Sequence, residues 1–430
     1  SGKRAKAPGL LTKLQGGYME LVRAIVRPPR AEYVLDDLGP QIFKLRGKMY
    51  ERTDLEIVNQ RGQKLVCSWW QPVAAERVAK ELPCVVYMHG NSSCRIEALE
   101  NLPLVLSGGC TLFALDFAGC GHSDGEYITL GYNERDDLKA AVSHLRGTGH
   151  VSTVALWGRS MGAATALLHG PRDPSIAAMV LDSPFSSLER LCWEIVDQVN
   201  IRHKPRFIVS AGLRVMRRSV MKMTGMDILR LKPIERADSC FIPTVFVAGR
   251  EDQFIPPCHT QDIYDRYAGE KNMVLVDGGH NSKRPTYFMD SVTIFFYNRL
   301  CVPAGLTEEQ LGMQPANLFR EGSLLSSLVA SVTGAQSPRV EHRQTQAAEQ
   351  QASERRSWFQ RKNARAEMGY PDAHAGADDE RKPLSREGNG ATAAGVPQQQ
   401  TSPLRDLVAC ATSAKQSTLP SRQRVQEALK

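Results

Sequence analysis

The feature that most constrains the fold of this chain is an alternation of short apolar runs and helical patterns between residues 31 and 303. The apolar runs are rich in β-branched residues, as strands covered on both faces must be. They predict strands at residues 53–59, 64–72, 83–90, 110–117, 152–158, 177–185, 243–249 and 272–280. Helices are predicted at residues 134–146, 160–170, 257–268 and 285–300. This order predicts an α/β fold with a mostly parallel sheet and helices on both faces.

The interval between residues 185 and 243 is longer than one crossover between strands requires. We expect it to hold two or three amphipathic helices that form a lid over about residues 186–241. Some of its apolar residues would either line an acyl-binding site or pack in the core: Leu188, Leu191, Trp193, Ile195 and Val196. Its basic residues would either favour an anionic or membrane-borne substrate or form a solvated helix face: Arg202, Lys204, Arg206, Arg214, Arg217 and Arg218.

The two ends of the chain differ in composition from the predicted domain at residues 31–303. Residues 1–30 carry seven Lys or Arg side chains and one acid, and apolar residues recur there at roughly helical spacing. This segment would either contact anionic lipid peripherally or pack as a helix on its own domain. In residues 304–430, the part beyond Gly334 is rich in Gln, Ala, Ser, Arg and Pro. Such a composition buries too little apolar surface to offset chain entropy, so the tail is predicted to be largely disordered.

Composition also bears on compartment, partners and cofactors. No apolar run approaches the roughly 18 residues of a membrane-spanning helix, and we see no secretory signal. The ten cysteines are scattered without C-x-x-C spacing, which is typical of reduced cysteines in the cytoplasm. The net charge of +8 is modest for 430 residues, so we expect no nucleic-acid partner. Without a glycine-rich phosphate loop or a His or Cys cluster, we expect no cofactor, neither nucleotide nor metal.

The strand at residues 152–158 runs into Gly158-Arg159-Ser160-Met161-Gly162 and then into an alanine-rich helix. A strand, a G-x-S-x-G turn and a helix in this order form a sharp elbow that exposes a nucleophilic serine above a parallel sheet. Glycine is expected at residues 158 and 162 because side chains there would collide across the turn. The amide dipoles of the following helix also favour negative charge near Ser160. Ser160 is therefore the candidate nucleophile.

A serine nucleophile needs a base, and the base needs an acid to orient it. Asp252 follows the next-but-one strand and His280 follows the last strand, so both lie at strand carboxyl ends. Open α/β sheets bind their ligands at that edge. The chain order Ser160, Asp252, His280 is that of one serine-hydrolase architecture and differs from the trypsin-like and subtilisin-like orders. We predict these residues to be a catalytic triad.

Three other residues compete for these roles. Asp182 ends the strand before that of Asp252, and it would either orient the histidine or accept backbone amides at the turn into the lid. Glu251 is a weaker rival acid or a solvated loop charge. His89 would be a second base or a structural residue that ties down its loop.

An oxyanion intermediate needs two backbone N–H donors. One is expected from Met161, the residue after the nucleophile. The other is expected from Asn91 in the loop His89-Gly90-Asn91-Ser92, where Gly90 would let the backbone approach closely. The alternative is that Asn91 is an ordinary turn residue.

These residues resemble the α/β-hydrolase superfamily, in the serine-aminopeptidase-like, prolyl-oligopeptidase-related branch that also holds protein depalmitoylases. The resemblance covers roughly residues 30–303 and is strongest to a largely uncharacterised plant and protist group. It rests on RPPRAEY, HGNS, LDFAGCGHSDG, LWGRSMGA, LDSPFSSL, DQFIPPCH and GGHNSKRP. It implies the α/β-hydrolase fold and the triad but no settled substrate. Too few residues precede the sheet to build the propeller of prolyl oligopeptidases, so a peptidase activity does not follow.

One departure from most of the superfamily stands next to the predicted base. His280 is followed by Asn281-Ser282-Lys283-Arg284-Pro285, a stretch expected to shape the acyl or leaving-group side of the site. We expect a cytoplasmic serine hydrolase that cleaves an ester, thioester or amide of a small or acylated substrate. An acyltransferase with the same triad and a non-catalytic scaffold with a partner-binding tail are the alternatives. The acyl chain, the leaving group and the oligomeric state do not follow from the sequence.

Overall fold

The computed structural model describes residues 18–20, 22, 23, 25–198 and 206–303. Most of the basic segment predicted at residues 1–30 lies outside the described residues, as do Arg202 and Lys204 of the lid. The tail predicted to be disordered, residues 304–430, lies outside them as well.

A nine-stranded sheet forms the centre of the described domain, in the order β1-β2-β3-β5-β4-β6-β7-β8-β9. Its strands are β1 (Ile42–Leu45), β2 (Lys48–Val58), β3 (Lys64–Pro72), β4 (Leu82–Met88), β5 (Thr111–Leu115), β6 (Val151–Arg159), β7 (Ala178–Asp182), β8 (Thr244–Gly249) and β9 (Lys271–Val276). The neighbouring strands β1 and β2, β2 and β3, and β3 and β5 pair antiparallel. All pairs from β5 to β9 are parallel, so the sheet is mostly parallel as predicted.

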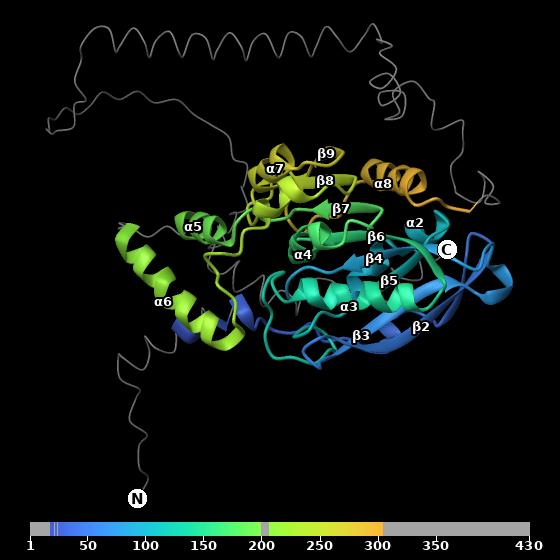
Figure 1. The fold of residues 1–430 in the computed structure, drawn as a ribbon, viewed down its shortest axis with the longest axis horizontal. Helices are drawn as coiled ribbons and strands as arrows, with labels where there is room; N and C mark the ends of the chain where they lie inside the picture. Colours follow the sequence, from blue (N-terminus) through green and yellow to red (C-terminus); the bar gives the residue numbers. More distant parts are fainter. Residues whose placement is uncertain (1–17, 21, 24, 199–205, 304–430) are drawn as a thin grey trace, which may run out of the picture. The chain divides into compact units, whose positions relative to one another are not determined.

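Helices cover both faces of the sheet (Figure 1). On one face, α3 (Glu134–Gly147), α4 (Met161–His169) and α7 (Pro257–Arg266) contribute to one apolar cluster with the strands. On the other face, α2 (Leu102–Ser107) and α8 (Thr286–Arg299) contribute to a second cluster. Side chains of β4 alternate between the two clusters, as successive residues of a strand must. The continuous apolar runs in the sequence therefore reflect burial on both faces.

The eight predicted strands and the four predicted helices are all present, with shifts of a few residues at their ends. β1 and α2 were not predicted. They have only four and six residues, so neither shows a recognisable period in the sequence. The sheet order, the two helix layers and the helices inserted after β7 confirm the predicted α/β-hydrolase fold.

The lid contains α5 (Leu188–Gln198), α6 (Arg206–Thr224) and the short 3-10 helix η5 (Pro233–Ser239). Figure 1 shows α5 and α6 outside the two helix layers that cover the sheet. We call the apolar residues beneath them the lid cluster: Val22, Val26, Ala164, Leu168, Phe185, Leu188, Leu191, Met216, Val220, Met226, Ile228, Leu231 and Ile255. Because Val22 and Val26 are fully buried in it, the described part of the N-terminal segment packs on its own domain.

Candidate active site

Ser160 lies at the turn between β6 and α4, with φ 53° and ψ −113°. A positive φ is costly for a residue with a side chain and is found where the surrounding structure enforces it. The Ser160 N–H donates to the Asp182 carbonyl oxygen at 2.7 Å, which fixes the turn to β7. A Cβ on Gly158 would overlap the backbone of Gly162, and a Cβ on Gly162 would overlap the carbonyl of Met88. The predicted steric need for both glycines is confirmed.

Asp252 and His280 are joined by a hydrogen bond between His280 Nδ1 and Asp252 Oδ2, at 2.7 Å. The Asp252 side chain is fully buried. Its other oxygen accepts the backbone N–H groups of Phe254 and Ile255 at 3.0 and 2.8 Å. A carboxylate held in this way keeps the proton on Nδ1 and leaves the Nε2 lone pair of His280 available as a base.

Ser160, Asp252 and His280 follow the carboxyl ends of β6, β8 and β9, all in the parallel part of the sheet. Arg159, next to Ser160, donates to the His280 carbonyl oxygen at 2.7 Å, which links the elbow to the histidine loop. In the described part of the chain, no hydrogen bond joins the Ser160 hydroxyl to the His280 ring. The arrangement is compatible with a triad, whose role remains a prediction.

The expected oxyanion donors flank the elbow. Met161 is the first residue of α4, and Asn91 lies in the loop after β4. Across the described ranges, neither backbone N–H has a hydrogen-bond acceptor, as donors for an oxyanion require. A Cβ added to Gly90 would lie 3.8 Å from the Ser160 Cβ, so this loop is close to the candidate nucleophile. At that distance a side chain is tolerated, so close approach does not explain glycine at residue 90.

Asp182 does not contact His280. Its carboxylate accepts two hydrogen bonds from the Arg284 guanidinium, at 2.8 and 2.6 Å, and one from the Ser183 hydroxyl at 3.0 Å. The sequence allowed two interpretations of Asp182, and the contacts agree with the structural one. The partners expected for it were backbone amides, and that part of the prediction is wrong. The true partner follows it by 102 residues, so local sequence could not indicate it.

Arg284 also donates to the carbonyl oxygens of Gly279 and Ser282, at 3.3 and 3.4 Å. Its side chain is only 7% exposed, so the pair with Asp182 is buried. A bidentate, desolvated arginine–carboxylate pair fixes both partners in orientation as well as distance. Arg284 therefore holds the loop that carries His280 against the end of β7. The sequence singled out the stretch after His280 but not this contact.

His89 and Glu251 both have structural partners. The Phe117 N–H donates to His89 Nε2 at 3.1 Å, which places the proton on Nδ1, where it is donated to the Gly90 carbonyl at 2.7 Å. Both ring nitrogens are used, so His89 is the loop-tying histidine. Glu251 accepts the Gly278 N–H and so joins the loops after β8 and β9.

A second histidine–carboxylate pair, which the sequence did not reveal, lies at the base of the lid. His259 of α7 bonds through Nε2 to Glu194 of α5 at 2.6 Å. Its Nδ1 accepts the backbone N–H of Ser186 at 3.1 Å and contacts the Ser186 hydroxyl at 2.7 Å. His259 is fully buried. This pair connects the lid to the helix layer of the sheet.

The lid also reaches the acid loop. Phe254 packs against the lid cluster, and its ring centroid is 5.2 Å from that of His280. The Gln198 side chain at the end of α5 donates to the Gln253 carbonyl at 2.8 Å. Leu188 and Leu191, considered as acyl-site residues, are buried in the lid cluster. Arg217 is paired with Asp227.

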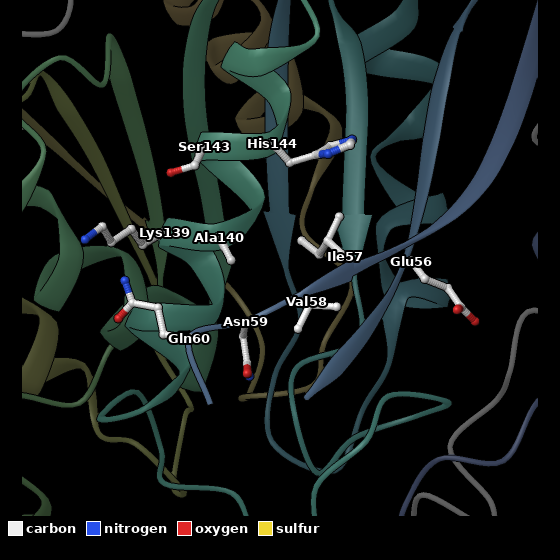
Figure 2. Close-up of a pocket in the computed structure, with 9 residues that line it drawn as sticks. All are labelled: Glu56, Ile57, Val58, Asn59, Gln60, Lys139, Ala140, Ser143 and His144. Atoms are coloured by element: carbon white, nitrogen blue, oxygen red, sulfur yellow. The ribbon is translucent and has the colours of Figure 1, made fainter. Parts of the chain in front are cut away.

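A cavity of about 430 Å³ lies elsewhere, between the end of β2 and α3. Figure 2 shows Lys139, Ser143 and His144 projecting from α3 above the strand that carries Glu56 and Val58. None of the predicted site residues lines it. The predicted site residues Ser160, Asp252 and His280 lie instead at the carboxyl ends of β6, β8 and β9.

Within the described ranges, none of the helices has the length and apolar composition that crossing a bilayer requires. The same residues contain no group of three or more His, Cys, Asp or Glu side chains arranged to hold a metal ion.

Comparison with known proteins finds similarity over part of the described domain. The family Hydrolase_4, described as serine aminopeptidase, S33, matches residues 84–225, which include the Asn91 loop and the elbow. Uncharacterized protein YqkD of Bacillus subtilis is 25% identical over 202 residues, covering 46% of this chain and 64% of that protein. Human monoglyceride lipase is 33% identical over 131 residues, covering 30% of this chain and 42% of that protein.

A solved structure, the esterase Pf2001 of Pyrococcus furiosus, aligns with a TM-score of 0.48 and 22% identity, over 64% of this chain and all of that chain. The chain spans less than two thirds of the length of both sequence relatives above. The family match and the order of strands and helices agree with the predicted α/β-hydrolase fold.

Proposed function

We propose that this protein is a serine hydrolase that cleaves an ester, thioester or amide through an acyl-enzyme on Ser160. The observation that carries the proposal is the 2.7 Å hydrogen bond between Asp252 and His280 Nδ1. It leaves Nε2 unprotonated at the same sheet edge as a serine held at positive φ. A base, its orienting acid and a nucleophile at the same edge of the sheet are the parts that acyl transfer needs.

In the proposed reaction, His280 Nε2 accepts the hydroxyl proton of Ser160 as the oxygen attacks the substrate carbonyl. The Met161 and Asn91 N–H groups donate to the resulting oxyanion. The imidazolium, stabilised by Asp252, then gives its proton to the leaving group as the carbonyl–heteroatom bond breaks. Water, activated by the same histidine, attacks the acyl-enzyme and releases the acid and free Ser160.

Several finer points belong to the proposal. An acyl ester is our preferred substrate, because one relative carries the name monoglyceride lipase. We also propose a closest relationship to the plant and protist group, a hydrolase domain at residues 31–303 and a cytoplasmic location. We further propose that residues 1–30 contact a membrane peripherally.

Labelling with a fluorophosphonate probe tests the proposal. We expect the wild-type chain to be labelled and Ser160→Ala to be unlabelled, while circular dichroism shows both to be folded. Ser186→Ala is the matched control, because Ser186 also contacts a histidine that is paired with a carboxylate. It should keep the label. A folded wild type that does not react contradicts the proposal and favours the scaffold alternative. A Ser160→Ala variant that does react contradicts the assignment of Ser160 as the nucleophile.

A further inference from the structure

The outer face of α6 carries exposed apolar and basic residues and no acid. The helix sequence, RFIVSAGLRVMRRSVMKMT, contains no Asp or Glu. Phe207 is 74% exposed, Ile208 55% and Val215 50%. Large apolar side chains exposed together on one helix mark an interaction surface.

These residues form two neighbouring rows with a spacing of four. Phe207, Ala211 and Val215 make an apolar row. Arg214, Arg218 and Lys222 make a basic row, and each follows one member of the apolar row by seven residues. Because seven residues are nearly two helical turns, the rows lie side by side on one face. All six side chains are exposed.

The opposite face of α6 fixes which way these rows point. Leu213, Met216 and Val220 are buried, the last two in the lid cluster. The Tyr18 hydroxyl contacts the Ser219 hydroxyl at 2.6 Å, which ties α6 to the N-terminal segment. The helix is therefore anchored from within, and its two rows face away from the domain. Figure 1 shows α6 away from the sheet and from the helices that cover it.

We propose that this outer face of α6 docks the protein on an anionic lipid membrane. Arg214, Arg218 and Lys222 form no ion pair with any other residue of the described ranges, so their charge is available to lipid headgroups. Phe207, Ile208 and Val215 would enter the boundary between headgroups and acyl chains, as the apolar face of an interfacial helix does. A nucleic acid or an acidic peptide would satisfy the basic row but leave the apolar row in water.

The docked helix would sit close in structure to the candidate active site. Met216 and Val220 beneath it share the lid cluster with Ile255, and Phe254 packs on that cluster beside His280. An acyl chain that leaves the membrane would then contact the lid before it reaches Ser160. This part of the inference rests on the proposed function, whereas the docking does not.

Vesicle sedimentation of the full chain tests the docking. Vesicles of phosphatidylcholine alone are compared with vesicles that also contain phosphatidylserine. Wild type should bind the second kind. Arg214→Gln/Arg218→Gln/Lys222→Gln should bind it about a hundredfold more weakly, since each cation near an anionic surface contributes about fivefold. Phe207→Ser/Val215→Ser should also bind about a hundredfold more weakly, because it removes two large apolar side chains from the boundary of the bilayer.

Lys44→Gln/Lys80→Gln/Lys139→Gln is the matched control, because it removes the same charge from exposed positions outside the lid. It should bind as wild type does. Equal losses in this control and in the α6 variants would overturn the assignment, as would a basic-row variant that still binds. Binding to an oligonucleotide or an acidic peptide that ignores the Phe207→Ser/Val215→Ser change would also overturn it. Fluorophosphonate labelling without vesicles reports separately on the proposed function.

Discussion

Two histidine–carboxylate pairs in this molecule look alike by distance and differ in what they can do. His280 bonds to Asp252 at 2.7 Å at the carboxyl edge of the sheet. His259 bonds to Glu194 at 2.6 Å beneath the lid. The second pair even has a serine, Ser186, with its hydroxyl 2.7 Å from the ring. A search for a serine, a histidine and an acid in direct contact would select the set beneath the lid.

The difference lies in the protons. Asp252 holds the Nδ1 proton of His280, so Nε2 keeps its lone pair. At His259 the backbone N–H of Ser186 occupies the Nδ1 lone pair, and the remaining proton is directed at Glu194. Ser186 is 2% exposed and, unlike Ser160, does not have a positive φ. The comparison teaches that neighbours of the right residue types are not enough for a serine nucleophile. It also needs a histidine nitrogen with an available lone pair and a backbone that the surrounding structure holds at positive φ.

The largest expected effect separates the two serine–histidine sets. Ser160→Ala and His280→Gln should each lower kcat by about a millionfold, as loss of a nucleophile or base does. Ser186→Ala should change kcat little because its hydroxyl takes no part in the proposed chemistry. Hydrolysis of a soluble ester, measured on folded variants, checks this. Comparable losses in the Ser186 variant would reverse the assignment of the two sets.

The next effect distinguishes the two carboxylates. Asp252→Asn should lower kcat by about ten thousandfold, because an amide favours the wrong tautomer of His280. Glu194→Gln removes the charge from the buried pair. It should change kcat little and instead lower the urea concentration at which half of the protein is unfolded. Measuring kcat and the unfolding midpoint for both variants tests the contrast. An active Asp252→Asn enzyme would show that another group orients the base.

A smaller effect is expected from Arg284→Lys. Lysine keeps the charge but cannot make both hydrogen bonds to Asp182, so the His280 loop should shift and kcat should fall about a hundredfold, with KM little changed. Arg146→Lys is the control, because Arg146 also contacts both oxygens of an aspartate, far from the site. If Arg284→Lys lowers stability but leaves kcat unchanged, Arg284 does not position His280.

The smallest effect concerns pH. Burial, partly opposed by Glu194, lowers the pKa of His259 below its usual 6.5. The folded chain therefore holds this ring neutral while the unfolded chain takes up a proton, so its contribution to stability is present above pH 6.5 and is lost as pH falls below it. The free energy of unfolding of wild type should decrease more steeply with acid than that of His259→Gln. Equal slopes would show that His259 does not titrate on unfolding.

The sequence was sufficient for the parts of this molecule that depend on local pattern and chain order. Strands buried on both faces, the glycine elbow and the sheet-edge positions of Asp252 and His280 all follow from it. The side-chain pairs across long separations do not. Glu194 and His259 are 65 residues apart, and Arg159 reaches a carbonyl 121 residues away. Such contacts arise only when strands that are distant in sequence become neighbours.

The buried pair of Asp182 and Arg284 has a consequence for how the chain can be made. Asp182 ends a strand in the middle of the sheet, yet the cation that neutralises it is synthesised 102 residues later. An unpaired carboxylate is costly to bury, so a nascent chain that has not yet released Arg284 from the ribosome should keep the end of β7 hydrated. β7, which lies between the strands that end at the elbow and at the acid loop, would then be among the last strands to pack. It would do so only after the loop that carries Arg284 has left the ribosome.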